Sequence, residues 1–113
     1  MKKEFRLKKR AAFTYVYKRG ERTRTRHLAL IYAKSGEGLK IGLSVSSKVG
    51  GAVVRNRVKR LLREALTPLV SRIDPGYLYV IAVQPSAAEL DFHGISEAVG
   101  TAFARAGKLR AEE

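Results

Sequence analysis

The sequence contains no cysteine, so disulfide bonds, thiolate zinc sites and cysteine nucleophiles are all excluded. No stretch approaches the roughly 18 uninterrupted apolar residues of a membrane-spanning helix. The first ten residues also lack the apolar centre of a secretory signal peptide. We therefore expect a soluble, cytoplasmic protein. The hydrophobic content of 45% predicts a folded chain, and the length of 113 residues predicts one domain.

Acidic residues are scarce in the first half of the chain. Residues 1–63 hold 19 of the 23 Lys and Arg residues but only three acidic residues, whereas residues 64–113 hold four basic and seven acidic residues. Charge that served only solubility would be spread more evenly, so this segregation favours a nucleic-acid surface. A membrane surface is the weaker alternative, because basic membrane-binding helices usually expose bulky apolar residues.

Residues for an independent catalytic site are also missing. A two-metal nuclease needs clustered carboxylates, and the basic half offers only three scattered ones. His27 and His93 lie in different predicted elements, so we expect surface or packing roles for both. Gly50-Gly51 precedes a helix but fits neither nucleotide-binding glycine pattern, so it favours a turn or a close phosphate contact. A free-standing nuclease is therefore disfavoured.

A helix predicted from about Ala52 to Thr67 divides its residues between two faces. At about 100° per residue, the apolar residues form one stripe, which favours packing against a core. The opposite side carries cations and a single carboxylate, Glu64, near its edge, unlike a solvated helix of mixed charge. We therefore expect a polyanionic partner and no core role for the cationic side. The stripe comprises Val54, Val58, Leu61, Leu62, Ala65, Leu66 and Leu69; the cationic side comprises Asn56, Lys59, Arg60, Arg63 and Thr67, flanked by Arg55 and Arg57.

The remaining pattern predicts the order helix, strand, strand, helix, strand, helix. This order indicates an α+β fold, a two-layer sandwich in which helices pack on a small mixed sheet. The strand–helix–strand unit suggests that its two strands are parallel, and the nearly continuous apolar run at Tyr77–Val83 predicts a central strand. Residues 22–26 alternate basic and β-branched side chains, as in an exposed lead-in to a strand. The other expected elements are helices at about Lys9–Arg19, stopped by Gly20, and from Glu89 or Asp91 to Lys108, strands at His27–Ala33 and Leu39–Ser46 joined by a hairpin turn at 35–38, and a turn at 74–76.

Two aromatic residues of the first helix are a second indication of RNA binding. Phe13 and Tyr17 lie one helical turn apart, near Lys9 and Arg10. Rings beside cations commonly stack on single-stranded bases. The alternative is that both rings anchor the helix to the core, and the sequence alone does not decide between the two.

The residues around the second helix resemble the signature of the protein subunit of bacterial ribonuclease P. The resemblance rests on Lys48-x-Gly50-x-Ala52-Val53-x-Arg55-Asn56-Arg57-x-Lys59-Arg60, a long motif with fixed spacing. It extends to Leu7-Lys8-Lys9-x-x-x-Phe13-x-x-Val16-Tyr17-x-x-Gly20 and to Ile41-Gly42-Leu43-Ser44-Val45-Ser46.

The resemblance implies a subunit of a ribonucleoprotein endonuclease that removes the 5′ leader of precursor tRNA. The catalytic groups and Mg²⁺ would belong mainly to an RNA subunit, and the protein alone would be inactive. The implied partners are this catalytic RNA and precursor tRNA, with no membrane and no obligate protein partner. The resemblance also implies a left-handed strand–helix–strand crossover, against the usual right-handed rule. The implied contacts are Lys48, Arg55, Asn56, Arg57, Lys59, Arg60 and Arg63 for the catalytic RNA, and Phe13, Tyr17, Lys9 and Arg10 for the leader.

The sequence departs from the family pattern at a few positions. Many relatives carry basic residues where Ser47, Val83 and Gln84 stand, and an aromatic residue where Leu28 stands. We therefore expect the two rings to contribute relatively more to leader binding here. The alternative function is a general RNA-binding protein, such as a ribosomal protein of similar fold. In either case we expect residues 1–113 to form one RNA-binding domain, with a basic N-terminal tail at about 1–8 and a frayed C-terminal tail at about 109–113.

Overall fold

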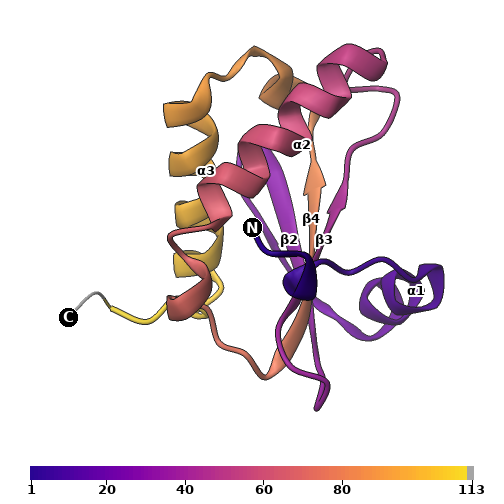
Figure 1. Ribbon diagram of the computed structural model, residues 1–113, viewed down its shortest axis with the longest axis vertical. Helices are drawn as coiled ribbons and strands as arrows, with labels where there is room; N and C mark the ends of the chain where they lie inside the picture. Colours follow the sequence, from indigo (N-terminus) through magenta and orange to yellow (C-terminus); the bar gives the residue numbers. More distant parts are fainter. Residues whose placement is uncertain (112–113) are drawn as a thin grey trace.

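The computed structural model describes residues 1–111, which form a four-stranded mixed sheet with helices on both faces. Figure 1 shows α1 on one face of the sheet and α2 and α3 on the other. The α+β class is thus confirmed, with one strand more than predicted. The elements are η1 (Lys3–Phe5), α1 (Arg10–Arg19), β1 (Glu21–Arg24), β2 (Leu28–Lys34), β3 (Lys40–Ser44), α2 (Ala52–Leu66), η2 (Val70–Arg72), β4 (Tyr77–Val83), η3 (Pro85–Glu89) and α3 (Phe92–Arg105), where η denotes a 3₁₀ helix.

The strand order is β1-β2-β4-β3, which overturns one prediction. β2 and β3 do not form a hairpin, because β4 lies between them and pairs antiparallel with β2 and parallel with β3. The antiparallel hairpin joins β1 to β2 instead, and β1 was predicted only as a lead-in. The apolar side chains of β4 are suited to this central place, since a strand there is covered on both faces.

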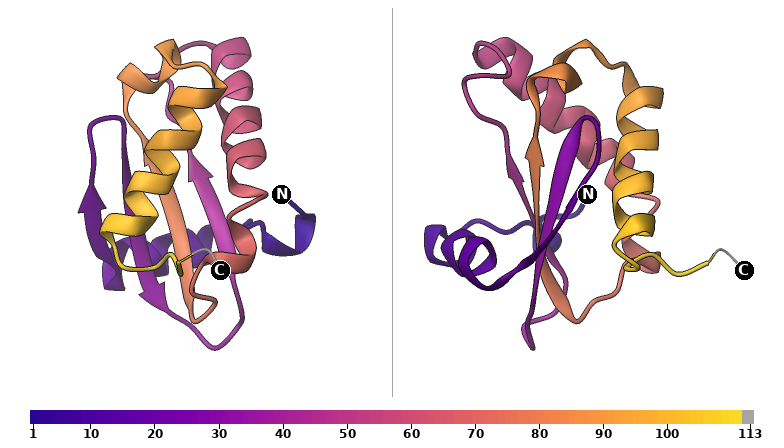
Figure 2. Two further views of the ribbon diagram at one scale, coloured as in Figure 1. Left: turned by 90° about the vertical axis from the view of Figure 1, so that its left-hand side faces the viewer. Right: turned by 180° about the vertical axis from the view of Figure 1, so that it is seen from behind.

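The β3–α2–β4 unit confirms the predicted parallel pair. In the left-hand view of Figure 2, both strands point upward with the helices in front, and the chain passes from β3 on the right to β4 on its left. The crossover is therefore left-handed, as the resemblance implies. It brings α2 across the sheet onto the face that α3 also covers.

The core has two parts, one on each face of the sheet. The larger part lies beneath α2 and α3, where Tyr79 and Phe103 pack with ring centroids 5.2 Å apart. Burial raises the pKa of the Tyr79 hydroxyl, with Asp74 adding to the rise, and this hydroxyl donates to the Asp74 carbonyl at 2.6 Å. The smaller part lies beneath α1, around Val16 and Ile31.

The ends of the helices follow from local chemistry. α2 ends at Leu66, close to the predicted end before Pro68. The side chain of Asp91 caps α3 by accepting from the Gly94 N–H at 2.8 Å. α3 ends at Arg105, short of the predicted Lys108, and Gly107 supplies the left-handed φ of 72° beyond it.

The first eight residues pack against the body of the protein. Leu7 is buried, and its N–H donates to the Ile41 carbonyl of β3 at 3.0 Å. The terminal amino group donates to Thr67 Oγ1 at 2.7 Å. The segment predicted as a basic tail therefore borders both β3 and α2. Of the predicted C-terminal tail, Leu109 bridges to Ile73, whereas residues 112–113 lie outside the described residues.

Candidate nucleic-acid interface

The basic residues of this protein have almost no acidic partners. Within residues 1–111 the single ion pair is His93 with Glu97, at 4.0 Å and exposed. The Lys and Arg side chains of that part of the chain therefore present uncompensated positive charge. Such a surface attracts polyanions and releases their counterions on binding.

The two faces of α2 lie as predicted. The stripe residues Val58, Leu61, Leu62, Ala65 and Leu66 are buried, and Val54 and Leu69 pack half-buried beside them. On the flank toward β3, Arg55, Lys59 and Arg63 follow one another at successive turns and are half-buried. Asn56 and Arg60 point outward and are exposed, as is Lys48 in the turn before the helix.

A cationic hollow of about 180 Å³ lies between α2 and the N-terminal segment. Arg6, Lys8, Lys59 and Arg63 line it, together with the aromatic ring of Phe13. Burial lowers the pKa of Arg63, and the positive charge of Arg6 lowers it further. The Nε atoms of Arg6, Arg55 and Arg63 are buried without a hydrogen-bond partner among residues 1–111. Like charges held together in this way favour an anion such as a phosphate between them.

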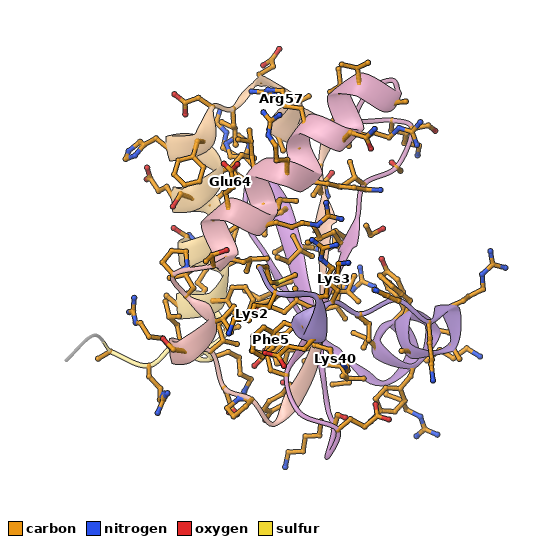
Figure 3. All side chains as sticks on the ribbon, in the orientation of Figure 1. Lys2, Lys3, Phe5, Lys40, Arg57 and Glu64 are labelled. Carbon is orange, nitrogen blue, oxygen red and sulfur yellow. The ribbon has the colours of Figure 1, made fainter. Side chains whose placement is uncertain are left out.

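Arg57 lies on the other flank of α2, and its contacts add a structural role to the RNA-binding role predicted for it. Figure 3 shows its side chain beside the segment that leads into α3. One terminal nitrogen donates to the Ala88 carbonyl at 3.1 Å and the other to the Leu90 carbonyl at 2.8 Å. The guanidinium therefore ties α2 to η3 and to the residue that follows it, a link for which the helical pattern gave no signal.

The structure distinguishes between the two aromatic rings of α1. Phe13 is half-buried against the backbone of Gly42, where an added Cβ would lie 2.6 Å from the ring carbon Cε1. Tyr17 is 38% exposed, and the guanidinium carbon of Arg22 lies 5.9 Å from its ring centroid. Phe13 thus packs, whereas the Tyr17 ring is accessible.

Lys9 and Arg10 lie at the start of α1, at the other end of the helix from Tyr17. Both are exposed, and the first turn contains no acidic residue. Cations at a helix N-terminus oppose the helix dipole, so their placement is unfavourable unless an anion is bound nearby.

Several other positions have simple surroundings. His27 Nδ1 lies 2.8 Å from Ser86 Oγ. Val83 is buried on the α2 and α3 side of the sheet, whereas Gln84 and Ser47 are exposed.

Over residues 1–111 no three His, Asp or Glu residues gather in a way that could hold a metal ion. No helix in the same range is both long and apolar enough to cross a membrane.

Comparison with known proteins identifies the family. The family model described as ribonuclease P matches residues 1–107. The chain belongs to the ribonuclease P protein family. The ribonuclease P protein component of Bacillus cereus is 38% identical over 112 residues, which cover 97% of each chain. That of Listeria monocytogenes is 40% identical over 102 residues, covering 88% of this chain and 85% of the relative.

Solved structures of the family share the fold. The RNase P protein of Staphylococcus aureus superposes with a TM-score of 0.87 at 27% identity, covering 94% of this chain and 98% of that one. The RNase P protein of Thermotoga maritima gives a TM-score of 0.80 at 25% identity, covering 88% and 96%. The chain is thus a protein subunit of ribonuclease P, a ribonucleoprotein endonuclease of tRNA processing.

Proposed function

We propose that this protein binds the catalytic RNA of ribonuclease P and the 5′ leader of precursor tRNA, and so assists removal of the leader in the cytoplasm. The observation that carries the proposal is the large positive charge of residues 1–63 with no Lys or Arg paired to a carboxylate in the described chain. RNA-based catalysis with Mg²⁺ held mainly by the RNA subunit accords with a surface built to bind RNA. One RNA-binding domain then serves both partners.

The catalytic RNA is proposed to lie along α2 and the cationic hollow beside it. Lys59 and Arg63 line this hollow, Arg6 contributes a further charge to it, and Arg55 lies one turn before Lys59 on the same flank of the helix. Phosphate groups suit this surface, because their oxygens can accept hydrogen bonds from the buried Nε donors and their charge offsets the repulsion between the arginines. Lys48, Asn56 and Arg60 extend the same surface outward, and Arg57 adds its charge from the other flank.

The leader is proposed to lie on the opposite face of the sheet, beside α1. Tyr17 offers an accessible ring for base stacking, and Phe13 supports the site from its packed position. Lys9 and Arg10 would contact phosphates at the start of the helix. The two RNA partners would thus occupy different faces of one small domain.

Two neighbouring arginines of α2 should respond differently to replacement by alanine. Arg57→Ala removes two hydrogen bonds from a charged donor, so we expect a loss of about 1–3 kcal/mol in the free energy of unfolding. Arg60→Ala removes an exposed side chain and should leave stability unchanged, while lowering the slope of log K against log[salt] for the catalytic RNA by about 0.7–0.9. Urea denaturation and binding titrations at several salt concentrations measure both quantities. Equal stability of the two variants would contradict the structural role of Arg57.

Cleavage assays test the proposed function as a whole. Purified protein free of RNA, incubated with precursor tRNA and Mg²⁺, should release no leader. The catalytic RNA with this protein should cleave precursor tRNA more efficiently than the RNA alone at low Mg²⁺, because the protein neutralises phosphate repulsion. Site-specific cleavage by the protein alone, or no effect of the protein on the RNA, would refute the proposal. Co-purification with ribosomal particles in place of one large RNA would support the general RNA-binding alternative.

A further inference from the structure

The edge strand β1 carries two arginines on the same face of the sheet as α1. Arg22 pairs with Ile31 and Arg24 pairs with Ala29 across the antiparallel ladder. Directly paired residues point to the same face, and Ile31 belongs to the core beneath α1. Both arginines therefore project beside α1 rather than toward α2 and α3.

Three residues with small side chains lie in line with Arg24 across the neighbouring strands of the sheet. Ala29 pairs with Ala82, and Ala82 pairs with Ser44, so one line runs through all four strands. Ala82 and Ser44 are half-exposed whereas Ala29 is buried, and Figure 1 shows α1 against the other end of this face. At about 4.8 Å between strands, the row spans roughly 14 Å across the sheet. Its one charged end is Arg24.

The two arginines are placed as phosphate ligands would be. Both are exposed, and no carboxylate pairs with either among residues 1–111. Arg22 lies against the ring of Tyr17, which directs it toward α1. Residues two apart on a strand are separated by about 6.7 Å, a spacing comparable to that of neighbouring phosphates in an extended nucleotide chain. Charge on an edge strand also deters aggregation, but that role requires neither this face nor the contact with Tyr17.

We propose that Arg22 and Arg24 form a cationic wall that binds phosphates of the single-stranded leader where it crosses this face of the sheet at Ala82 and Ser44. The inference rests on the proposed function, because it takes the leader to lie beside α1. It adds β1 to the site and extends leader binding beyond α1 to the free edge of the sheet. Because phosphates carry no sequence information, this wall strengthens leader binding without selecting bases.

Charge-neutralising variants in the reconstituted holoenzyme test this inference. We compare Arg24→Gln, the double variant R22Q/R24Q and the control Arg105→Gln, which removes the same charge from an exposed position on α3. Affinities for precursor tRNA with a long leader, for mature tRNA and for the catalytic RNA are measured over a range of salt concentrations. Each lost phosphate contact should lower the salt slope for precursor tRNA by about 0.7, which weakens binding about fourfold at 0.15 M salt. Arg105→Gln should leave all three affinities unchanged.

The outcomes separate the wall from the proposed function. If the wild-type holoenzyme does not prefer precursor to mature tRNA, leader binding itself is refuted. If the wild type shows the preference and R22Q/R24Q keeps it with an unchanged slope, the wall is refuted while leader binding beside α1 stands. Equal losses for precursor and mature tRNA, or a loss of affinity for the catalytic RNA, would also overturn the assignment. Thermal unfolding of each variant confirms that the fold is intact, as expected for exposed side chains.

Discussion

Tyr17→Ala should weaken binding of precursor tRNA to the reconstituted holoenzyme by about 1–3 kcal/mol, the loss typical of a ring that stacks on a base. The Tyr17 side chain is 38% exposed and belongs to neither part of the core, so we expect its removal to leave stability nearly unchanged. Mature tRNA has no leader, so its affinity should barely change and the preference for precursor should collapse. Binding titrations with both tRNAs measure the effect. An equal loss for the two would remove Tyr17 from the leader site.

Phe13→Ala is the matched variant, one helical turn away, and should have the opposite signature. Its ring packs against Gly42 in the smaller core, so we expect a loss of about 1–3 kcal/mol in the free energy of unfolding, below the 3–5 kcal/mol of a fully buried phenylalanine. Affinity for both tRNAs should then fall together as α1 loosens. Unchanged thermal stability with a selective loss for precursor would instead make Phe13 a direct leader contact.

Gly20→Ala should be among the most destabilising substitutions in the protein. Gly20 follows α1 in an extended conformation (φ −83°, ψ 156°), so no left-handed turn requires glycine there. Glycine is needed because there is no room for a side chain. An added Cβ would collide with the Val16 carbonyl oxygen and lie 2.9 Å from both Ile31 Cγ2 and the Tyr32 carbonyl oxygen. Two of these three atoms are backbone atoms that cannot turn aside. We expect a loss of about 3 kcal/mol or more, and a fall in Tm of roughly 10 °C or more.

Gly100→Ala provides the control, with the opposite sign. Gly100 lies within α3, and an added Cβ would meet no atom within 4 Å. Alanine is the better helix former there, so we expect a gain of about 0.5–1 kcal/mol. Thermal and urea unfolding of the two variants measure both changes. A Gly20→Ala protein as stable as wild type would show that α1 can move away from β2 at little cost.

The sequence predicted best where one residue pattern determines one environment. The apolar stripe of α2 forms the buried side of that helix, because helical spacing alone fixes which side chains share a face. The apolar run of β4 likewise predicted a central strand, since a strand without polar positions must be covered on both faces. The parallel pairing of β3 with β4 followed from the helix between them.

Other features depend on partners that a local pattern does not reveal. The turn at 35–38 is compatible with a hairpin, but β4 pairs with both β2 and β3 and keeps them apart. The structural role of Arg57 depends on carbonyl groups of Ala88 and Leu90, more than 30 residues away along the chain. For Arg22 and Arg24 the basic and β-branched alternation indicated only a lead-in to a strand, and the ladder is needed to show that they form β1 and share a face with α1.

The central position of β4 also determines when this protein can fold during synthesis. β4 is the last strand made, yet it supplies a partner to both β2 and β3. A nascent chain that ends before Tyr77 therefore has β1 and β2 as its only complete strand pair. Such pairings between distant segments form slowly, because a long loop must close before they gain any contact. Until β4 and α3 emerge, the growing polypeptide exposes apolar surface on a strongly basic chain that is still attached to an RNA-rich ribosome.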